Sequence, residues 1–384
     1  MIGLGVIGLG RGFMLTLPAL LASDRIRLAA AFDVRADARD RFAQDFAATS
    51  HPSIDALLND GQVDAVYIAT PHGLHAEQAI AAAKAGKHVL VEKPMATTVA
   101  DCEAMIAAAD AAGTILIVGP SHGFDASVQR ASELAQSGQF GAVRMVTAFN
   151  YTDFVYRPRR PEELDPAQGG GVVYSQGAHH FDVVRRIIGK PVRDVTAIAG
   201  NWDAARAGDG AYSAFVRFEG DVAATMTYSG YAHYDSDELL GWISELGRDK
   251  NPESYGAARR TLAALSPDDE VRAKLTRTYG AAGSSGDEPR APHHEHFGFI
   301  LVSCERADLK VLPDGVWVFE DDERRFLPLA RPTAPRAGVV AEFAAAVTGE
   351  APPIHDGAWG LETMRCCDAL IRSSHTGQPA AIAR

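Results

Sequence analysis

The stretch MIGLGVIGLGRGF (residues 1–13) contains two overlapping glycine patterns of the kind that surrounds a pyrophosphate. The pattern Gly-x-Gly-x-x-Gly fits fully at Gly3, Gly5 and Gly8. The next register, at Gly8 and Gly10, fits incompletely, because Phe13 stands at the third glycine position. Such a pattern binds phosphate only when it follows a strand and opens a helix, so the flanking residues decide between the two registers.

The later register is the one that leaves room for a strand. Residues 2–7 form a short apolar run before the turn at residues 8–10, and a helical stretch follows from about Arg11. Phe13 at the third position predicts that this helix packs less closely on its strand, unless Gly12 takes over that role. The sequence therefore predicts a strand, a phosphate-binding turn and a helix, in that order.

Apolar strands and amphipathic helices continue to alternate through the first 120 residues. Strands separated by helices of this length indicate βαβ units and a doubly wound parallel sheet with helices on both faces, the Rossmann arrangement. The predicted strands are 26–32, 64–70, 88–92 and 114–119, and the predicted helices are 36–46, 74–86 and 98–112.

Asp33 directly follows the predicted strand 26–32, the second strand of the chain. At this place an acidic side chain would accept hydrogen bonds from the ribose hydroxyls of a dinucleotide. An acid at this position disfavours a 2′-phosphate, so we expect NAD as the cofactor. Arg35, two residues further on, leaves NADP open as an alternative. A simpler interpretation is that Asp33 only caps its loop.

Length and charge narrow the class of protein. A chain of 384 residues is long enough for two domains, and its net charge of −12 argues against a general nucleic-acid or anionic-membrane surface. The four cysteines form neither a disulfide framework nor a zinc pattern, which is typical of a cytoplasmic protein. We therefore expect a small-molecule substrate, with neither nucleic acid nor a membrane as a partner.

Two longer stretches resemble the Gfo/Idh/MocA oxidoreductases. The first, ATPHGLHAEQAIAAAKAGKHVLVEKPMA (residues 69–96), contains the family's Glu-Lys-Pro hallmark at residues 92–94. The second, GGGVVYSQGAHHFDVVRRIIG (residues 169–189), resembles the glycine-rich segment that leads into its Asp-x-x-x-His helix. The resemblance implies a Rossmann domain over residues 1–121, and an α/β domain with a large, mostly antiparallel sheet over residues 122–384. It also implies a nicotinamide cleft between the domains, and a homodimer or homotetramer formed through the C-terminal sheet.

The resemblance assigns proton transfer to Lys93. Alcohol oxidation removes a hydride from carbon and a proton from the hydroxyl group. A lysine that is partly desolvated beside a cationic ring has a lowered pKa and can take up that proton near neutral pH. The motif makes a mere surface lysine the less favoured interpretation. Pro94 fixes the chain after the strand and would direct Lys93 at the substrate.

The second motif departs from the family pattern, because the usual aspartate falls on Ser175. The family histidine falls on His179, which we expect to be catalytic and not only a packed core histidine, and a further acid falls on Asp182. Ser175, Gln176 or Tyr174 must fill the place of the missing carboxylate. Because one branch of the family pairs its lysine with a tyrosine, Tyr174 is the third catalytic candidate.

The remaining site residues also follow from the resemblance. The cofactor-binding set comprises Gly8, Leu9, Gly10, Arg11, Gly12, Phe13, Asp33, Arg35, Thr70, Pro71, His72, His75, Glu92 and Lys93. The substrate-binding set comprises His122, Arg157, Arg159, Arg160, Ser175, Gln176, His179 and Asp182.

The sequence HHEHF (residues 293–297) invites a metal interpretation, but adjacent residues point apart and metal ligands must converge. We therefore predict no metal site there and leave open a role near the substrate for His294 or His296. The roles of these histidines, including His293, are not fixed by the sequence.

Three classes of function remain: an NAD-dependent alcohol dehydrogenase, a redox-neutral glycosidase that uses NAD transiently, and a non-catalytic sensor. The intact Glu-Lys-Pro motif disfavours a sensor. Within the first class, residues 150–164, 200–203, 229–238 and 297–309 resemble the family's phthalate dihydrodiol dehydrogenases, and a sugar or cyclitol dehydrogenase is the alternative.

The basic patch YRPRRP (residues 156–161) suits a dicarboxylate substrate, although a solvated loop or subunit contact explains it equally well.

Overall fold

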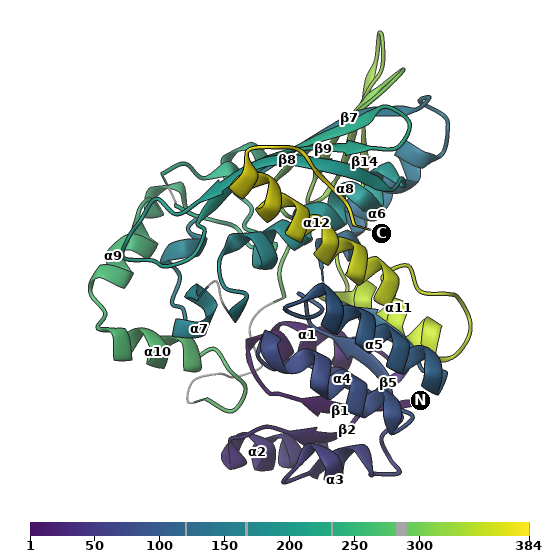
Figure 1. The fold of residues 1–384 in the computed structure, drawn as a ribbon, viewed down its shortest axis with the longest axis vertical. Helices are drawn as coiled ribbons and strands as arrows, with labels where there is room; N and C mark the ends of the chain where they lie inside the picture. The colour runs from purple at the N-terminus through teal and green to yellow at the C-terminus, as the bar shows by residue number, and fades with distance from the viewer. Residues whose placement is uncertain (120, 166–167, 232, 282–289, 384) are drawn as a thin grey trace. The chain divides into compact units, whose positions relative to one another are not determined.

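The computed structural model describes residues 1–119, 121–165, 168–231, 233–281 and 290–383. The chain forms two compact units (Figure 1). Unit 1 contains Met1–Pro120, Val271–Arg290 and Thr333–Met364, and unit 2 contains Ser121–Glu270, Ala291–Pro332 and Arg365–Arg384. The first boundary lies next to the predicted one at residues 121/122. The difference is that the described residues of 271–281 and residues 333–364, expected in the second domain, belong to the first unit.

Unit 1 is a doubly wound sheet of six parallel strands in the order β3-β2-β1-β4-β5-β6, which confirms the predicted Rossmann arrangement. The strands are β1 (Ile2–Ile7), β2 (Ile26–Phe32), β3 (Thr49–Ser50), β4 (Ala65–Ile68), β5 (His88–Val91) and β6 (Leu116–Val118). The helices are α1 (Arg11–Ala22), α2 (Ala36–Phe46), α3 (Ile54–Leu58), η1 (His72–Leu74), α4 (His75–Lys84), α5 (Val99–Ala112) and α11 (Ala337–Val347). The strand order reverses between β1 and β4, the point where sheets of this kind bind nucleotides at the carboxyl ends of their strands.

Gly3 and Gly5 serve packing within β1, not phosphate binding. A Cβ atom at Gly3 would lie 2.0 Å from the carbonyl oxygen of Gln62, and one at Gly5 would lie 2.8 Å from the Leu57 side chain. The segment before β4 therefore lies directly against the first strand. This contact explains the complete but misleading early glycine pattern.

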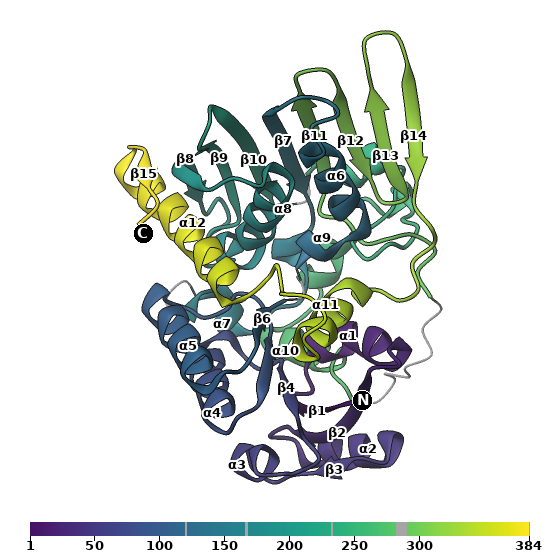
Figure 2. The ribbon, with the colours of Figure 1, turned by 90° about the vertical axis from the view of Figure 1, so that its right-hand side faces the viewer.

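Unit 2 contains a nine-stranded sheet in the order β14-β13-β12-β11-β7-β10-β9-β8-β15, in which β7 and β10 form the parallel pair and the other neighbours are antiparallel (Figure 2). The strands are β7 (Val143–Tyr151), β8 (Val192–Gly200), β9 (Ala211–Phe218), β10 (Val222–Ser229), β11 (Phe299–Cys304), β12 (Asp308–Leu312), β13 (Gly315–Phe319), β14 (Arg324–Pro328) and β15 (Ala380–Ala381). The predicted large, mostly antiparallel sheet is thus confirmed.

Helices α6 (Ala126–Gln136) and α8 (Ala178–Ile188) pack against this sheet and enclose the main core of unit 2 with it. Short elements connect the strands: η2 (His122–Phe124), η3 (Phe154–Tyr156), α7 (Pro161–Leu164), η5 (Val173–Gly177), η6 (Ser236–Leu240), η7 (Pro252–Ser254) and α9 (Ala257–Ala263). Helices α10 (Pro267–Leu275) and α12 (Gly357–Thr376) each include a boundary between the units. Several large apolar side chains on the sheet strands are solvent-exposed, namely Met145, Ile198, Phe215 and Phe326. Oligomerisation through this sheet stays a prediction.

Several predicted elements differ in extent from the observed ones. The strand expected at 64–70 spans Ala65–Ile68, and the one expected at 114–119 spans Leu116–Val118. Tyr279 is buried, and residues 282–289 lie outside the described residues. Cys366 and Cys367 lie in the core, within α12. Within the described residues, every helix is too short or too polar to cross a membrane.

We predict that Gly3→Ala lowers the free energy of unfolding by about 1–3 kcal/mol, the usual cost of overpacking, because the new methyl group meets a backbone carbonyl that cannot move aside. Urea denaturation provides the measurement. Gly61→Ala is the control, since no atom lies within 4 Å of a Cβ at that position. Equal stability of the two variants would contradict the assigned contact.

Candidate active-site residues and family membership

The turn between β1 and α1 has the features of a pyrophosphate cradle. Gly8 has a φ of +93°, and a Cβ there would lie 2.9 Å from the Ala69 backbone, so this position requires glycine. Gly10 is the N-cap of α1, and the closest atom to a Cβ added there, the Ala69 carbonyl oxygen, would lie 3.6 Å away. No side chain caps the first turn of α1, so its amides face the space in front of Gly10. The strand and the helix flank Gly8 and Gly10 as the later register requires, and these residues fit a dinucleotide.

Gly12 takes over the close approach that Phe13 cannot provide. A Cβ at Gly12 would lie 2.7 Å from the Glu92 Oε1 atom, so the first turn of α1 lies directly against this carboxylate. Phe13 is fully buried and instead packs against Phe42 and Tyr279, with ring centroids 5.8 and 5.5 Å away. The departure at the third glycine position thus moves the close contact by one residue.

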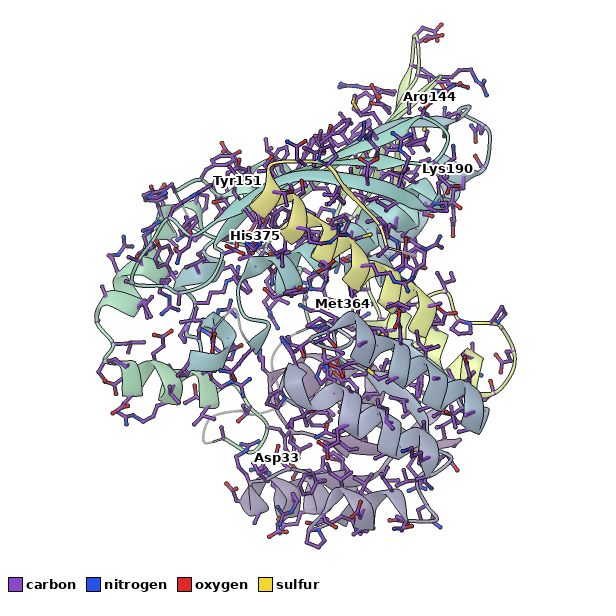
Figure 3. All side chains as sticks on the ribbon, in the orientation of Figure 1. Asp33, Arg144, Tyr151, Lys190, Met364 and His375 are labelled. Carbon is purple, nitrogen blue, oxygen red and sulfur yellow. The ribbon has the colours of Figure 1, made fainter. Side chains whose placement is uncertain are left out.

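Asp33, labelled in Figure 3, directly follows β2. It is buried, and its carboxylate holds the glycine turn. Its Oδ2 atom accepts a hydrogen bond of 2.7 Å from the Leu9 amide, and its Oδ1 atom accepts bonds from the amide and the Nε atom of Arg35, at 2.9 and 3.1 Å. The carboxylate therefore caps its loop, as the simpler interpretation expects. Binding of a ribose hydroxyl at Asp33 stays a prediction.

The Glu-Lys-Pro segment follows β5, and its glutamate belongs to a buried polar network. Glu92 Oε1 accepts a hydrogen bond of 2.6 Å from the Tyr67 hydroxyl and lies 3.4 Å from Arg336 Nη1. Arg336 also donates to Thr16 on α1. Burial and the Glu92 charge raise the pKa of Tyr67 well above its ordinary value, so Tyr67 is a stable hydrogen-bond donor. The network fixes the segment that carries Lys93.

The loop after β4 is tied to the same segment through His75. This buried imidazole lies 3.0 Å from the carbonyl oxygens of both Thr70 and Pro94, and burial lowers its pKa against the effect of those carbonyls. Its contacts position both loops. Pro71 and His72 begin the short helix η1, and the His72 ring lies 5.6 Å from that of His75. Cofactor contacts by these residues remain predictions.

In unit 2, His179 lies in the first turn of α8 and forms a polar cluster with η2. Its Nδ1 atom lies 3.0 Å from the Ser121 hydroxyl, and its ring lies 4.6 Å from that of His122. Burial lowers the pKa of His122, but the charge of Asp125 and a hydrogen bond of 2.7 Å to it outweigh this effect, so the net pKa is raised. The charged form of His122 is therefore favoured.

Asp182 has a structural partner in this cluster. Its Oδ2 atom accepts a hydrogen bond of 2.7 Å from the Gly123 amide, which ties α8 to η2. Phe297 closes the cluster on one side, with its ring 5.0 Å from that of His179 and 4.9 Å from that of His122. Phe297, which directly follows the HHEH sequence, is therefore in ring contact with His179, the predicted catalytic histidine.

The residues that replace the missing family aspartate lie on η5, a single π-helical turn that runs directly into α8. The Ser175 hydroxyl donates to the Gly171 carbonyl oxygen at 2.5 Å, and Gln176 is buried. Burial raises the pKa of Tyr174 to about 12, so this phenol is a hydrogen-bond donor at neutral pH and a poor base. π-Helical turns are frequent at functional sites.

The three arginines of the basic patch differ in how well they are neutralised. Arg157 forms ion pairs with Asp153 at 2.6 Å and Glu245 at 2.9 Å, which raise its pKa although burial opposes them. Arg160 lies 3.6 Å from Glu163.

Arg159 is the less compensated of these cations. The carboxylate with which it pairs, that of Glu163, is 3.8 Å away, and its guanidinium lies 3.5 Å from the centre of the Phe154 ring and donates to the Phe154 carbonyl oxygen. Its Nε atom is buried without a hydrogen-bond partner among the described residues. Burial lowers the pKa of Arg159 to about 10, with a further contribution from the neighbouring charge of Arg157.

The histidines of the HHEH sequence point to separate partners. His293 lies 2.6 Å from Asp314, His294 lies 2.6 Å from the Ala330 carbonyl oxygen, and His296 lies 2.9 Å from the Ile243 carbonyl oxygen. Within the described residues, no three or more His, Cys, Asp or Glu side chains converge as a metal site would require.

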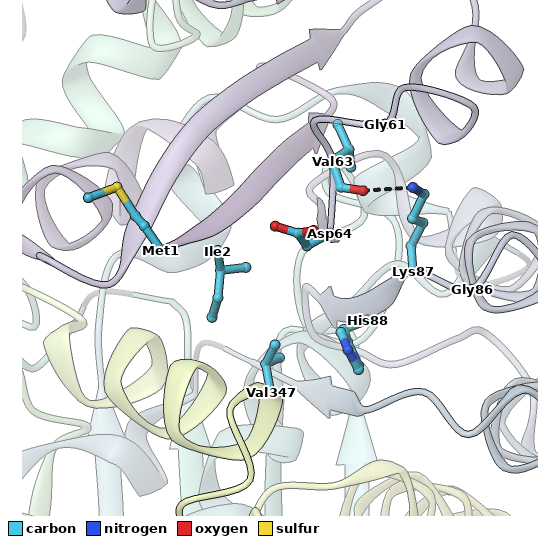
Figure 4. A pocket seen from close by; sticks show the side chains of 9 residues that line it. All are labelled: Met1, Ile2, Gly61, Val63, Asp64, Gly86, Lys87, His88 and Val347. Carbon is cyan, nitrogen blue, oxygen red and sulfur yellow. Dashed lines mark hydrogen bonds between the residues drawn. The ribbon is translucent and has the colours of Figure 1, made fainter.

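One pocket of unit 1, of about 450 Å³, lies at the wrong edge of the sheet for a nucleotide (Figure 4). It is lined by Ile2 and His88, which begin β1 and β5, and by Asp64, which precedes β4. In doubly wound sheets ligands bind at the carboxyl ends of the strands, which is the opposite edge. In this pocket Lys87 donates to the Val63 carbonyl oxygen at 2.6 Å.

Residues 2–120 match the model of the oxidoreductase family with an NAD-binding Rossmann fold, and residues 128–243 match that of the GFO/IDH/MocA C-terminal domain. The chain belongs to the Gfo/Idh/MocA oxidoreductases. It is 45% identical over 383 residues, 99% of this chain and 96% of the relative, to a 1-carboxy-3-chloro-3,4-dihydroxycyclohexa-1,5-diene dehydrogenase of Comamonas testosteroni. The recognition from the two sequence motifs is thus confirmed: the protein is an oxidoreductase with NAD as its cofactor.

Solved structures agree with this membership. A dehydrogenase from Bordetella bronchiseptica RB50 has a TM-score of 0.94 at 36% identity, with 99% of each chain covered. The WlbA dehydrogenase of Bordetella pertussis, in complex with NADH and UDP-GlcNAcA, has a TM-score of 0.70 at 22% identity, with 100% of this chain and 99% of that chain covered. At this identity the second likeness shows the fold alone.

Three contacts at the candidate sites were not predicted from the sequence: Ser121 beside His179, Arg336 beside Glu92, and Tyr279 beside the glycine turn. Ser121 had a signal, because it follows β6 at the carboxyl edge of the sheet. Arg336 and Tyr279 had no such signal. Both lie far along the chain, in segments that the predicted domain boundary placed in the second domain.

We predict that Gly10→Val abolishes or strongly weakens NAD binding while leaving the melting temperature nearly unchanged. The added side chain projects into the space where backbone must approach a pyrophosphate, and the protein itself leaves that space open. Isothermal titration with NAD and a thermal melt provide the two measurements. Gly61→Val is the control for substitution at an open glycine, and loss of binding in both variants would contradict the assignment.

Proposed function

We propose that this protein oxidises a carboxylated cis-dihydrodiol of an aromatic ring, with the cis-4,5-dihydrodiol of phthalate as substrate and 4,5-dihydroxyphthalate as product. The observation that carries the proposal is the weak compensation of Arg159, whose paired carboxylate, that of Glu163, is 3.8 Å away, while Arg157 has carboxylates at 2.6 and 2.9 Å. A planar carboxylate matches a guanidinium with parallel hydrogen bonds. The relative from Comamonas testosteroni supports the ring-diol class, since its name describes a carboxylated dihydroxycyclohexadiene.

The surroundings of Arg159 suit a flat, partly apolar ring. Phe154 stacks under the guanidinium and meets Tyr228 edge to face, and Tyr228 stacks on Phe297, which borders His179. Phe154 is partly exposed and can cover one face of a cyclohexadiene while the cation binds its carboxylate, and the buried rings of Tyr228 and Phe297 support it from the core. The continuous row of rings connects the anion-binding group with the histidine cluster within unit 2.

The reaction needs a proton acceptor and a hydride acceptor. NAD supplies the hydride acceptor when it is bound. We assign the role of proton acceptor to Lys93, which takes the hydroxyl proton as the carbinol C–H bond breaks and the carbonyl forms. The resulting ketone tautomerises to an aromatic diol, and the gain of aromaticity makes oxidation the favoured direction. The His179–His122 pair would orient the diol through hydrogen bonds.

A second candidate follows from the same relative: a dihydrodiol with one carboxylate. Arg157 is already neutralised by two carboxylates, so Arg159 is the cation of the patch best placed for a single anionic group. An uncharged sugar or cyclitol would not use Arg159 to bind an anionic group. A redox-neutral glycosidase would return its hydride and show no net NADH.

We expect Lys93→Met to lower turnover by roughly 10²-fold or more, the usual size of a general acid–base contribution, while NAD affinity is kept. Formation of NADH at saturating dihydrodiol is the measurement. Lys84→Met, a change at an exposed lysine of α4, is the control. Unchanged turnover in Lys93→Met would move the base to another group, with Tyr174 and His179 next to be tested.

The arginine patch gives a prediction that separates the substrate classes. Arg159→Ala is expected to lower kcat/KM on the phthalate dihydrodiol by a factor that corresponds to about 2–5 kcal/mol, and to leave an uncharged benzene dihydrodiol nearly unaffected. Arg144→Ala, a change at an exposed arginine of β7 outside the patch, is the control. Steady-state kinetics on the dicarboxylate, monocarboxylate and uncharged diols provide the measurement. Equal effects on all substrates at both positions would refute the carboxylate assignment.

A further inference from the structure

A segment distant in sequence closes over the glycine turn of unit 1. The chain leaves unit 1 after residue 120, returns at residue 271, and reaches the turn with Thr278, Tyr279 and Gly280. The Tyr279 amide donates to the Leu9 carbonyl oxygen at 3.1 Å. We call residues 278–280 the latch.

The latch is firmly anchored in unit 1. The Tyr279 ring packs against Phe13, Phe42 and Phe46, with centroids 5.5 to 6.1 Å away, and its hydroxyl donates to Asp45 at 2.6 Å. Gly280 has a φ of +77°, and a Cβ there would lie 3.3 Å from the Cα atom of Ala38, so the latch backbone lies close against α2.

The latch also engages most of the hydrogen-bonding capacity of Arg35. The Arg35 Nη1 atom donates to the Thr278 hydroxyl at 2.9 Å and to the Tyr279 carbonyl oxygen at 3.1 Å. Its Nη2 atom donates to the Leu9 carbonyl oxygen at 3.0 Å, and its Nε atom donates to Asp33 at 3.1 Å. A guanidinium has five N–H donors, and these four bonds leave one.

This arrangement bears on the choice between NAD and NADP. The two cofactors differ in a 2′-phosphate on the adenosine ribose, and recognition of this dianion near the end of β2 requires a cation with unsatisfied donors. Arg35 is the arginine nearest to that position in the sequence, yet its donors are turned to the glycine turn, Asp33 and the latch. We propose that the latch, through Thr278 and Tyr279, holds Arg35 in these bonds and thereby sets the preference of the enzyme for NAD over NADP.

The test compares direct binding of the two cofactors, with no substrate present. Thr278→Val removes the hydroxyl acceptor of Arg35 at nearly constant volume. We expect the ratio of the dissociation constants, NADP to NAD, to fall by about five- to tenfold, as the loss of one charge-assisted hydrogen bond would give. Thr276→Val is the matched control, because the Thr276 hydroxyl donates to the carbonyl oxygen of Ala273, in the last turn of α10. Isothermal titration or protein fluorescence measures both constants.

A double-variant cycle identifies the residue through which the latch acts. In an Arg35→Ala background, Thr278→Val should leave the NADP to NAD ratio unchanged, because the cation that it releases is gone. Tyr279→Phe keeps the aromatic packing and serves as a folded reference. A ratio that stays constant in Thr278→Val, or an equal weakening of both cofactors, would overturn the proposal. These results depend only on cofactor binding and are independent of the substrate proposed above.

Discussion

The hydrogen bond from the Leu9 amide to the Asp33 carboxylate is the constraint on which the nucleotide-binding edge of unit 1 depends. It joins the ends of β1 and β2, so the glycine turn cannot shift without moving the acid that ends the second strand. The Leu9 carbonyl oxygen then accepts from Arg35 and from Tyr279, so the amide and the carbonyl group of this residue are both fixed. The first turn of α1 is consequently held in place before any ligand arrives, which lowers the ordering cost of binding.

Unit 2 is organised around buried charges that are unequally compensated. Glu245 accepts from Arg157 and Asn150, and although burial opposes it, the arginine lowers the pKa of Glu245 to about 2. Arg206 is paired in the same way with Glu270. Buried ion pairs add little net stability, but removing one partner is costly. Arg206 is therefore a component of the scaffold, and among the arginines of the patch Arg157 is the better compensated and Arg159 the less compensated.

Local patterns in the sequence predicted most of unit 1, because a strand, a glycine turn and an amphipathic helix each leave a signal within about ten residues. The short elements β3 and α3 left too weak a signal. The predicted arginines lie in one hexapeptide, but their neutralising partners, Asp153, Glu163 and Glu245, come from a strand end, a short helix and a distant loop. Sequence therefore identified the patch, and only the structure distinguished its members. The same limit applied to Arg336, whose contact with Glu92 spans most of the chain.

The aromatic cluster of Phe13, Phe42, Phe46 and Tyr279 has a consequence for how the protein is made. Three of its rings lie within residues 13–46, and the fourth is synthesised only after the whole of the first long block of unit 2. During synthesis the Rossmann sheet can form from residues 1–120, but one side of Phe42 stays uncovered until Tyr279 arrives. The nascent chain therefore carries an apolar surface of the kind that chaperones bind. The nucleotide site becomes complete only late in translation.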